Sequence, residues 1–146
     1  MIIPQIQTIL RLTPNPRIIE CGACDGRDTV ALLMASTNGQ AQICSFEPDP
    51  RNAYLCKRTI PPVVYFEEAA VGNVTGTVDF NLASPQPNGE IGSSSLSGFK
   101  DLTKAFPWCK LEGTAKVQSW RLDDYCRAFR PENARALHNS DMLYLA

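Results

Sequence analysis

The stretch that decides the fold is Arg17-Ile-Ile-Glu-Cys-Gly-Ala-Cys-Asp-Gly26, together with Ile43-Cys-Ser-Phe-Glu-Pro48 further along the chain. Each begins as a short apolar strand and reaches a carboxylate, Glu20 in the first and Glu47 in the second. The first strand then breaks into a loop bounded by Gly22 and Gly26. Neighbouring parallel strands that end this way place both carboxylates and the loop around one crevice. A Rossmann-like sheet holds a nucleoside in such a crevice.

The composition is that of an ordinary globular protein. The chain has 146 residues, 44% of them hydrophobic and 20% charged, which is enough for one domain with a core. A net charge of -1 offers no basic surface to nucleic acid or to an anionic membrane. The sequence has neither an apolar run of the roughly 20 residues that span a bilayer nor the features of a signal peptide. We therefore expect a single cytoplasmic domain, residues 1–146, with neither nucleic acid nor membrane as a partner.

Strands and helices alternate along the first half of the chain, which predicts an α/β fold with a parallel sheet. Asp49 is placed to cap the helix that begins at Pro50, whereas Asp25 or Asp28 is expected to cap the helix before it and Asn38-Gly39 to end that helix. Residues 84–98, rich in serine, proline, glycine and asparagine, predict a loop. The expected helices are residues 4–12, 28–35, 50–59, 100–105 and 122–129, and the expected strands are residues 18–19, 41–47, 63–66, 77–82, 115–121 and 142–146.

Cysteines and the single histidine offer two other kinds of site. Cys21 and Cys24 form a C-x-x-C pair between a strand and a helix, roughly where a thiol-redox pair would lie, but we favour the interpretation that both pack the loop as small apolar residues. A zinc site would need a second pair of ligands at close spacing, which the sequence lacks. We expect no metal, and we interpret His138 as a surface or hydrogen-bonded core residue.

The glycine loop favours a cationic nucleoside over a dinucleotide. It departs from G-x-G-x-x-G because Cys24 stands where the middle glycine lets the backbone approach a pyrophosphate. Glu20, Asp25 and Asp28 also crowd the loop, and their charges would repel a pyrophosphate at short range. S-adenosylmethionine carries a sulfonium and an ammonium and has no phosphate. The acidic loop therefore predicts this methyl donor rather than NAD.

Glu47 has a natural role beside such a loop. A carboxylate at the end of the second strand accepts charge-assisted hydrogen bonds from both ribose hydroxyls, although on its own it could also cap the next helix or face solvent. Glu67 and Glu68 end the third strand, where an adenine amino group would lie. The sequence does not choose between these two glutamates, and either is also compatible with a surface charge.

Several motifs, in order, resemble those of the FkbM-type S-adenosylmethionine-dependent methyltransferases. The matching segments are Glu20-Cys-Gly-Ala-Cys-Asp-Gly26, Phe46-Glu-Pro48, Ala69-Ala-Val-Gly72, Gly76-Thr-Val-Asp-Phe80, Ser93-Ser-Ser-Leu96, Trp120-Arg-Leu-Asp-Asp124 and Asp141-Met-Leu-Tyr-Leu145. The resemblance implies a class I methyltransferase sheet that transfers a methyl group to a hydroxyl of a small molecule or glycan. Together, residues and resemblance predict that S-adenosylmethionine is bound by Glu20, Gly22, Ala23, Gly26, Glu47, Pro48, Glu68 and Ala69.

The last segment departs from the family pattern. Tyr144 stands where the family has lysine, and Ala146 stands where it has the acidic residue expected at the methyl-transfer site. We therefore expect a partial domain whose C-terminal strands are missing, and we assign no catalytic residue, although Asp141 and His138 lie near the last strand. A binding fragment without catalysis and a thiol-redox domain remain alternatives. An open sheet edge would also permit a homo-oligomer.

Overall fold

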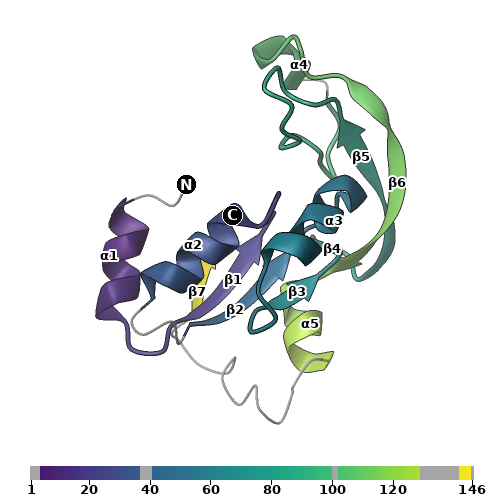
Figure 1. The fold of residues 1–146 in the computed structure, drawn as a ribbon. Helices are drawn as coiled ribbons and strands as arrows, with labels where there is room; N and C mark the ends of the chain where they lie inside the picture. The colour runs from purple at the N-terminus through teal and green to yellow at the C-terminus, as the bar shows by residue number, and fades with distance from the viewer. Residues whose placement is uncertain (1–3, 37–40, 100–101, 129–141, 146) are drawn as a thin grey trace.

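A computed structural model describes residues 4–36, 41–99, 102–128 and 142–145 and confirms a mixed α/β fold (Figure 1). The predicted Asn38-Gly39 helix stop, His138, Asp141 and Ala146 lie outside the described residues. Within them, every helix is too short or too polar to traverse a bilayer. The elements, in order, are α1 (Pro4–Leu12), β1 (Arg17–Cys21), α2 (Arg27–Ala35), β2 (Gln42–Phe46), α3 (Pro50–Thr59), β3 (Tyr65–Glu67), β4 (Ala69–Val71), β5 (Gly76–Ala83), α4 (Leu102–Ala105), β6 (Leu111–Trp120), α5 (Leu122–Ala128) and β7 (Met142–Leu145).

The predicted parallel sheet is present and has β1 and β2 at its centre. In the described residues it has four strands in the order β3-β2-β1-β7. Ile18 lies opposite Ile43 on β2 and opposite Leu143 on β7. The third strand starts later than predicted, at Tyr65, because Val64 is held in a turn by a hydrogen bond from its N–H to the Pro61 carbonyl. Parallel pairing brings the carboxyl ends of β1, β2 and β3 to one edge of the sheet.

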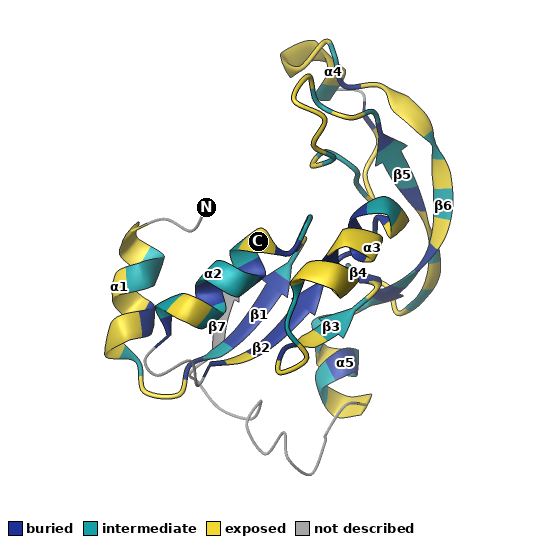
Figure 2. Ribbon diagram, viewed as in Figure 1, coloured by how far each residue is buried: buried dark blue, intermediate teal, exposed yellow. Residues whose placement is uncertain are grey.

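Both faces of the central strands β1 and β2 are covered, and most of their residues are buried (Figure 2). On one face, Ile18 packs in a cluster with Leu10 of α1 and Leu32 of α2. On the other face, its neighbour Ile19 packs in a cluster with Phe46 and with Tyr125 of α5. Successive side chains of a strand point to opposite faces, which explains why adjacent isoleucines belong to different clusters.

The two helices that follow β1 and β2 begin in different ways. At α3 the prediction is confirmed: Asp49 is the N-cap, its side chain accepts a hydrogen bond from the Arg51 N–H, and Pro50 opens the helix. At α2 the predicted position is wrong, because Gly26 occupies the N-cap with φ +82°, although Asp25 just before it accepts a hydrogen bond from the Arg27 N–H at 3.0 Å. A glycine there allows the left-handed turn that ends the loop.

A second sheet extends away from the first one. In the described residues its order is β4-β6-β5, with β4 parallel and β5 antiparallel to β6. Figure 1 shows β5 and β6 as a long curved ribbon with α4 near its far end. β4 was not predicted, because a strand of only three residues carries no detectable alternation. β6 also begins earlier than predicted, at Leu111, since its first residues pair with the end of β5.

Tyr125 joins α5 to the parallel sheet, and its truncation should be costly. Its ring meets Phe46 edge-on at 4.9 Å between centroids, and its hydroxyl donates to Glu67 Oε1 at 3.1 Å. We expect Tyr125→Ala to lower the free energy of unfolding by roughly 3–5 kcal/mol and Tyr125→Phe by about 1–2 kcal/mol. Urea denaturation measures both, and equal losses in the two variants would contradict the packing role of the ring.

Candidate functional site

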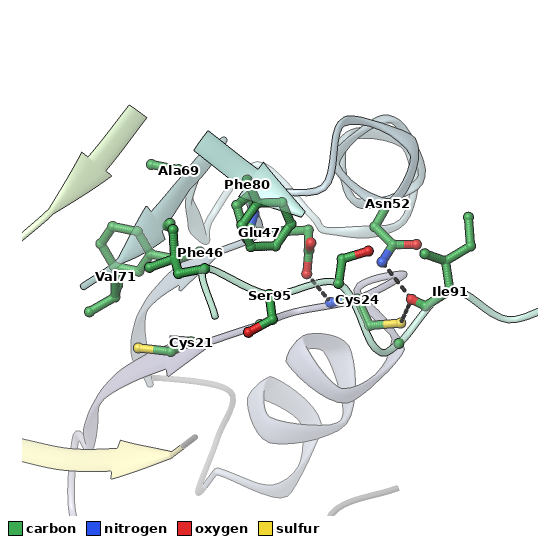
Figure 3. A pocket seen from close by; sticks show the side chains of 16 residues that line it. Cys21, Cys24, Phe46, Glu47, Asn52, Ala69, Val71, Phe80, Ile91 and Ser95 are labelled. Carbon is green, nitrogen blue, oxygen red and sulfur yellow. Dashed lines mark hydrogen bonds between the residues drawn. The ribbon is translucent and has the colours of Figure 1, made fainter. Parts of the chain in front are cut away.

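A cavity of about 310 Å³ lies at the carboxyl ends of β1 and β2, with Glu47 but not Glu20 in its lining (Figure 3). One wall comes from the glycine loop, the end of β2 and the first turn of α3. The other comes from β4, β5 and the loop after β5. The lining residues are Cys21, Gly22, Cys24, Phe46, Glu47, Pro48, Asn52, Ala69, Ala70, Val71, Phe80, Ile91, Gly92, Ser94, Ser95 and Leu96.

The glycine loop turns sharply between β1 and α2. Gly22 and Gly26 have φ of +87° and +82°, in the left-handed region that favours glycine. Cys24 between them has φ +55°, an uncommon conformation for a residue with a side chain. The N–H groups of Gly22 and Ala23 donate to the Phe46 carbonyl at 2.8 and 2.9 Å, which fixes the loop against the end of β2.

Glu47 lies at the centre of this arrangement. Its Oε2 accepts from the Cys24 N–H at 2.8 Å, and its Oε1 accepts from the Asp49 N–H at 2.8 Å. The residue is only 5% exposed. Burial raises the pKa of Glu47 from its ordinary value of 4.5 to about 7, although both backbone N–H groups favour the charged form. The carboxylate therefore holds the loop and the start of α3 together while it faces the cavity.

The structure brings together half of the residues predicted to bind the donor. Gly22, Glu47, Pro48 and Ala69 line the cavity. Ala23 is buried beside Gly22, where its N–H helps to hold the loop, and Gly26 is packed against the end of α3. A Cβ on Gly26 would lie 2.7 Å from Ile60 Cγ1, so glycine is required there by close packing.

Glu20 lies near the cavity, but its side chain is engaged elsewhere. It is 6% exposed, accepts from the Thr29 hydroxyl at 2.5 Å and also accepts from the Ser45 hydroxyl. These partners lie on α2 and β2, on the face of the sheet that Ile18 occupies. The Glu20 carboxylate thus connects β1, β2 and α2 and is not part of the cavity lining.

The glutamates at the end of β3 do not line the cavity either. Glu67 accepts a hydrogen bond from Tyr125, and the exposed Glu68 forms an ion pair with Lys57 of α3. The geometry of the cavity therefore does not show which of the two glutamates would lie beside an adenine amino group.

Charge in the cavity is carried by Glu47 alone among the described lining residues. Asp25, which the sequence placed at the loop, forms an ion pair with Arg27, and neither it nor Asp28 lines the cavity. The argument against a pyrophosphate therefore depends on Glu47 and on the absence of lysine and arginine from the described lining, rather than on three clustered carboxylates.

The cavity wall includes residues that sequence reasoning missed. Asn52 is 5% exposed and donates from Nδ2 to the Ile91 carbonyl at 2.7 Å (Figure 3). The sequence places Asn52 in a predicted helix and Ile91 in a predicted loop, and it gives no sign that the two residues meet. Phe80 faces the same cavity from β5. Their approach depends on the path of the chain between β2 and β5, and no local sequence signal marks it.

The C-x-x-C pair lacks the electrostatics of a redox centre. Burial and the nearby Glu20 raise the pKa of Cys21, and burial together with Asp25 and Glu47 raises the pKa of Cys24. A redox or nucleophilic cysteine needs a lowered pKa to supply thiolate. This environment disfavours thiol exchange and leaves both residues as lining of the cavity.

Comparison with known proteins finds a methyltransferase among the chain's relatives. The chain is 31% identical to 2-O-methyltransferase NoeI of Sinorhizobium fredii (strain NBRC 101917 / NGR234) over 128 residues, which cover 84% of this chain and 51% of that protein. The chain thus spans about half the length of this relative. No protein-family model and no solved structure matches. The similarity supports a methyltransferase family for the chain.

The raised pKa of Glu47 gives a testable pH dependence of stability. Because the folded-state pKa is about 7 and the ordinary value is 4.5, the stability that protonated Glu47 contributes is complete below 4.5 and is lost as pH rises through 7. We expect the free energy of unfolding to fall by up to roughly 3 kcal/mol across this window, and the fall to be absent in Glu47→Gln. Urea denaturation at several pH values measures it, and parallel curves for the two proteins would contradict the assignment.

Proposed function

We propose that this chain binds S-adenosylmethionine in the cavity at the ends of β1 and β2 and is part of an FkbM-type O-methyltransferase with a Rossmann-like sheet. The observation that carries the proposal is the buried Glu47 carboxylate, which faces the cavity while the glycine-loop N–H of Cys24 holds it in place at 2.8 Å. The acceptor we propose is a hydroxyl of a small molecule or glycan.

Glu47 is suited to hold the ribose of the donor. Each carboxylate oxygen accepts one backbone N–H and retains further acceptor capacity, so ribose hydroxyls can donate without displacing Cys24 or Asp49. Partial burial strengthens such charge-assisted bonds. The loop and α3 are already fixed around the carboxylate, which means that little reorganisation is needed when the donor binds.

The rest of the lining supports a nucleoside without phosphate. Phe46, Val71 and Phe80 provide apolar surface for an adenine base. The described lining has no lysine or arginine to neutralise a pyrophosphate, and Glu47 would repel one. Both features favour a cationic donor over NAD.

The relative supports the reaction type. It is a 2-O-methyltransferase, and 84% of this chain aligns with it. When bound, S-adenosylmethionine supplies a methyl group already activated by its sulfonium. The part of the protein is then to orient the donor through Glu47 and the loop, and to exclude water with the apolar wall. No residue in the described part of the chain is assigned as the base that accepts the hydroxyl proton.

Calorimetric titration with S-adenosylmethionine and S-adenosylhomocysteine tests the proposal. We expect both ligands to bind, NAD not to bind, and Glu47→Gln to weaken binding by roughly tenfold or more, because one charged acceptor for the ribose is lost. Asp79→Asn is the matched control, since Asp79 is an exposed carboxylate paired with Lys116 on β5 and β6. Absence of heat with wild-type protein of native circular dichroism would overturn the proposed function.

The two loop glycines separate binding from stability. An alanine Cβ at Gly22 meets no protein atom within 4 Å and would enter the cavity, whereas at Gly26 it would lie 2.7 Å from Ile60 Cγ1. Gly22→Ala should therefore lose about 1 kcal/mol of stability through its positive φ and should weaken donor binding. Gly26→Ala should lose roughly 1–3 kcal/mol more through overpacking. Denaturation and titration of both variants measure this, and equal stability of the two would refute the packing argument.

A further inference from the structure

We propose that Asn52, assisted by Cys24, is a positioning residue that holds residues 90–96, here called the strap, across the cavity, and that the strap controls escape of the donor. The inference rests on the proposed function. It adds a role for Asn52 and Ile91, which lie outside the family-like motifs, and it concerns the outer wall of the cavity rather than the ribose contact.

The strap forms most of the wall opposite the glycine loop. Its residues Ile91, Gly92, Ser94, Ser95 and Leu96 line the cavity. Leu96 is 38% exposed and Ile91 is half-buried, so the strap gains little from apolar burial. A segment of this kind keeps its position mainly through hydrogen bonds to the body of the protein.

The Ile91 carbonyl is the inner point of attachment. It accepts from Asn52 Nδ2 at 2.7 Å and from Cys24 Sγ at 3.3 Å, so α3 and the glycine loop hold the same atom (Figure 3). Asn52 also lines the cavity beside Glu47, and its side chain lowers the pKa of that carboxyl group. Asn52 therefore contacts both the carboxylate proposed to bind ribose and the strap that covers it.

A second attachment lies at Ser94. Its hydroxyl donates to Asp49 Oδ2 at 2.6 Å and accepts from the Ala83 N–H at 3.0 Å. Asp49 is fully buried and is paired with Arg51 at 2.7 Å. Burial raises the pKa of Asp49, but hydrogen bonds from Arg51 and Ser94 outweigh it and lower the pKa overall, which keeps the carboxylate charged as an acceptor.

The outermost attachment should matter least. Arg27 pairs with Glu90 at 2.8 Å, but its side chain is 68% exposed and that of Glu90 is 48% exposed. Solvent screening leaves such pairs worth little. Two backbone hydrogen bonds between Ser95 and Asn81 of β5, at 2.9 and 3.0 Å, also hold the outer part of the strap. Side chains of the protein body hold it at Ile91 and Ser94, and Asn52 is the side-chain anchor whose removal affects the cavity most directly.

This arrangement gives the Cys24 side chain a role. Its left-handed φ of +55° would suit glycine better, yet its thiol reaches the strap. A thiol is a weak donor, which makes Cys24 the lesser anchor and Asn52 the greater. Cys24→Gly removes the contact and relieves the backbone conformation at the same time, so it is a variant that retains the fold.

The test measures strap anchoring and ligand escape separately. Hydrogen exchange of residues 90–96 in the free protein reports anchoring, and stopped-flow dissociation of S-adenosylhomocysteine reports escape. We expect Asn52→Ala to speed both by roughly tenfold, with the association rate changed less than about threefold, and Cys24→Gly to act in the same direction but less strongly. Asn73→Ala, a change at an exposed asparagine outside both the strap and the cavity lining, should leave both rates near wild type.

The outcomes distinguish this proposal from the proposed function. If wild-type protein binds S-adenosylhomocysteine but Asn52→Ala changes neither strap exchange nor dissociation, the positioning role is wrong and the donor site stands. Faster strap exchange with unchanged dissociation also overturns the role, because the strap would then be structural only. If wild-type protein does not bind the ligand, the proposed function falls and the positioning role falls with it. Should Asn52→Ala fail to fold, Cys24→Gly decides by the same readouts.

Discussion

The hydrogen bonds between the buried Glu47 carboxylate and the N–H groups of Cys24 and Asp49, each at 2.8 Å, are the constraint on which the candidate site depends. Loss of water around this group is unfavourable, as its pKa of about 7 indicates. The backbone N–H groups offset part of that penalty only while the glycine loop and the start of α3 stay in place. The carboxylate thus fixes the geometry of both segments.

The rest of the cavity follows from the sheet around this carboxylate. Parallel pairing of β1 with β2 places the loop after β1 beside Phe46, whose carbonyl accepts from Gly22 and Ala23. The second sheet then brings the strap within reach of α3, where Ser94 donates to the buried Asp49 carboxylate, which is also paired with the partly exposed Arg51. Each wall is positioned by buried polar contacts. When one partner moves, the other is left buried without a hydrogen bond, which lowers the stability of the fold.

Sequence reasoning succeeded where a signal was local. Apolar runs located β1 and β2, and the Asp49-Pro50 pair correctly marked the start of α3. It failed at Asp25 and Asp28, because Gly26 ends the loop without a side-chain cap. The sequence also did not show which face of the sheet the Glu20 side chain occupies. In a sheet buried on both faces, apolar and polar residues do not alternate along a strand. The strap was not predictable because its contacts join segments far apart in the sequence.

The identity of the ligand class depends on fewer charges than the sequence indicated. In the proposed donor site, ion pairing of Asp25 and the turning away of Glu20 leave Glu47 as the charge that would repel a phosphate, and a single carboxylate would do so effectively only in a shielded cavity. A strap that keeps water out would strengthen this discrimination as well as slow escape of the donor. Cys24 contributes to the same discrimination. Its side chain stands where a dinucleotide site needs a glycine, and its thiol donates a hydrogen bond to the strap.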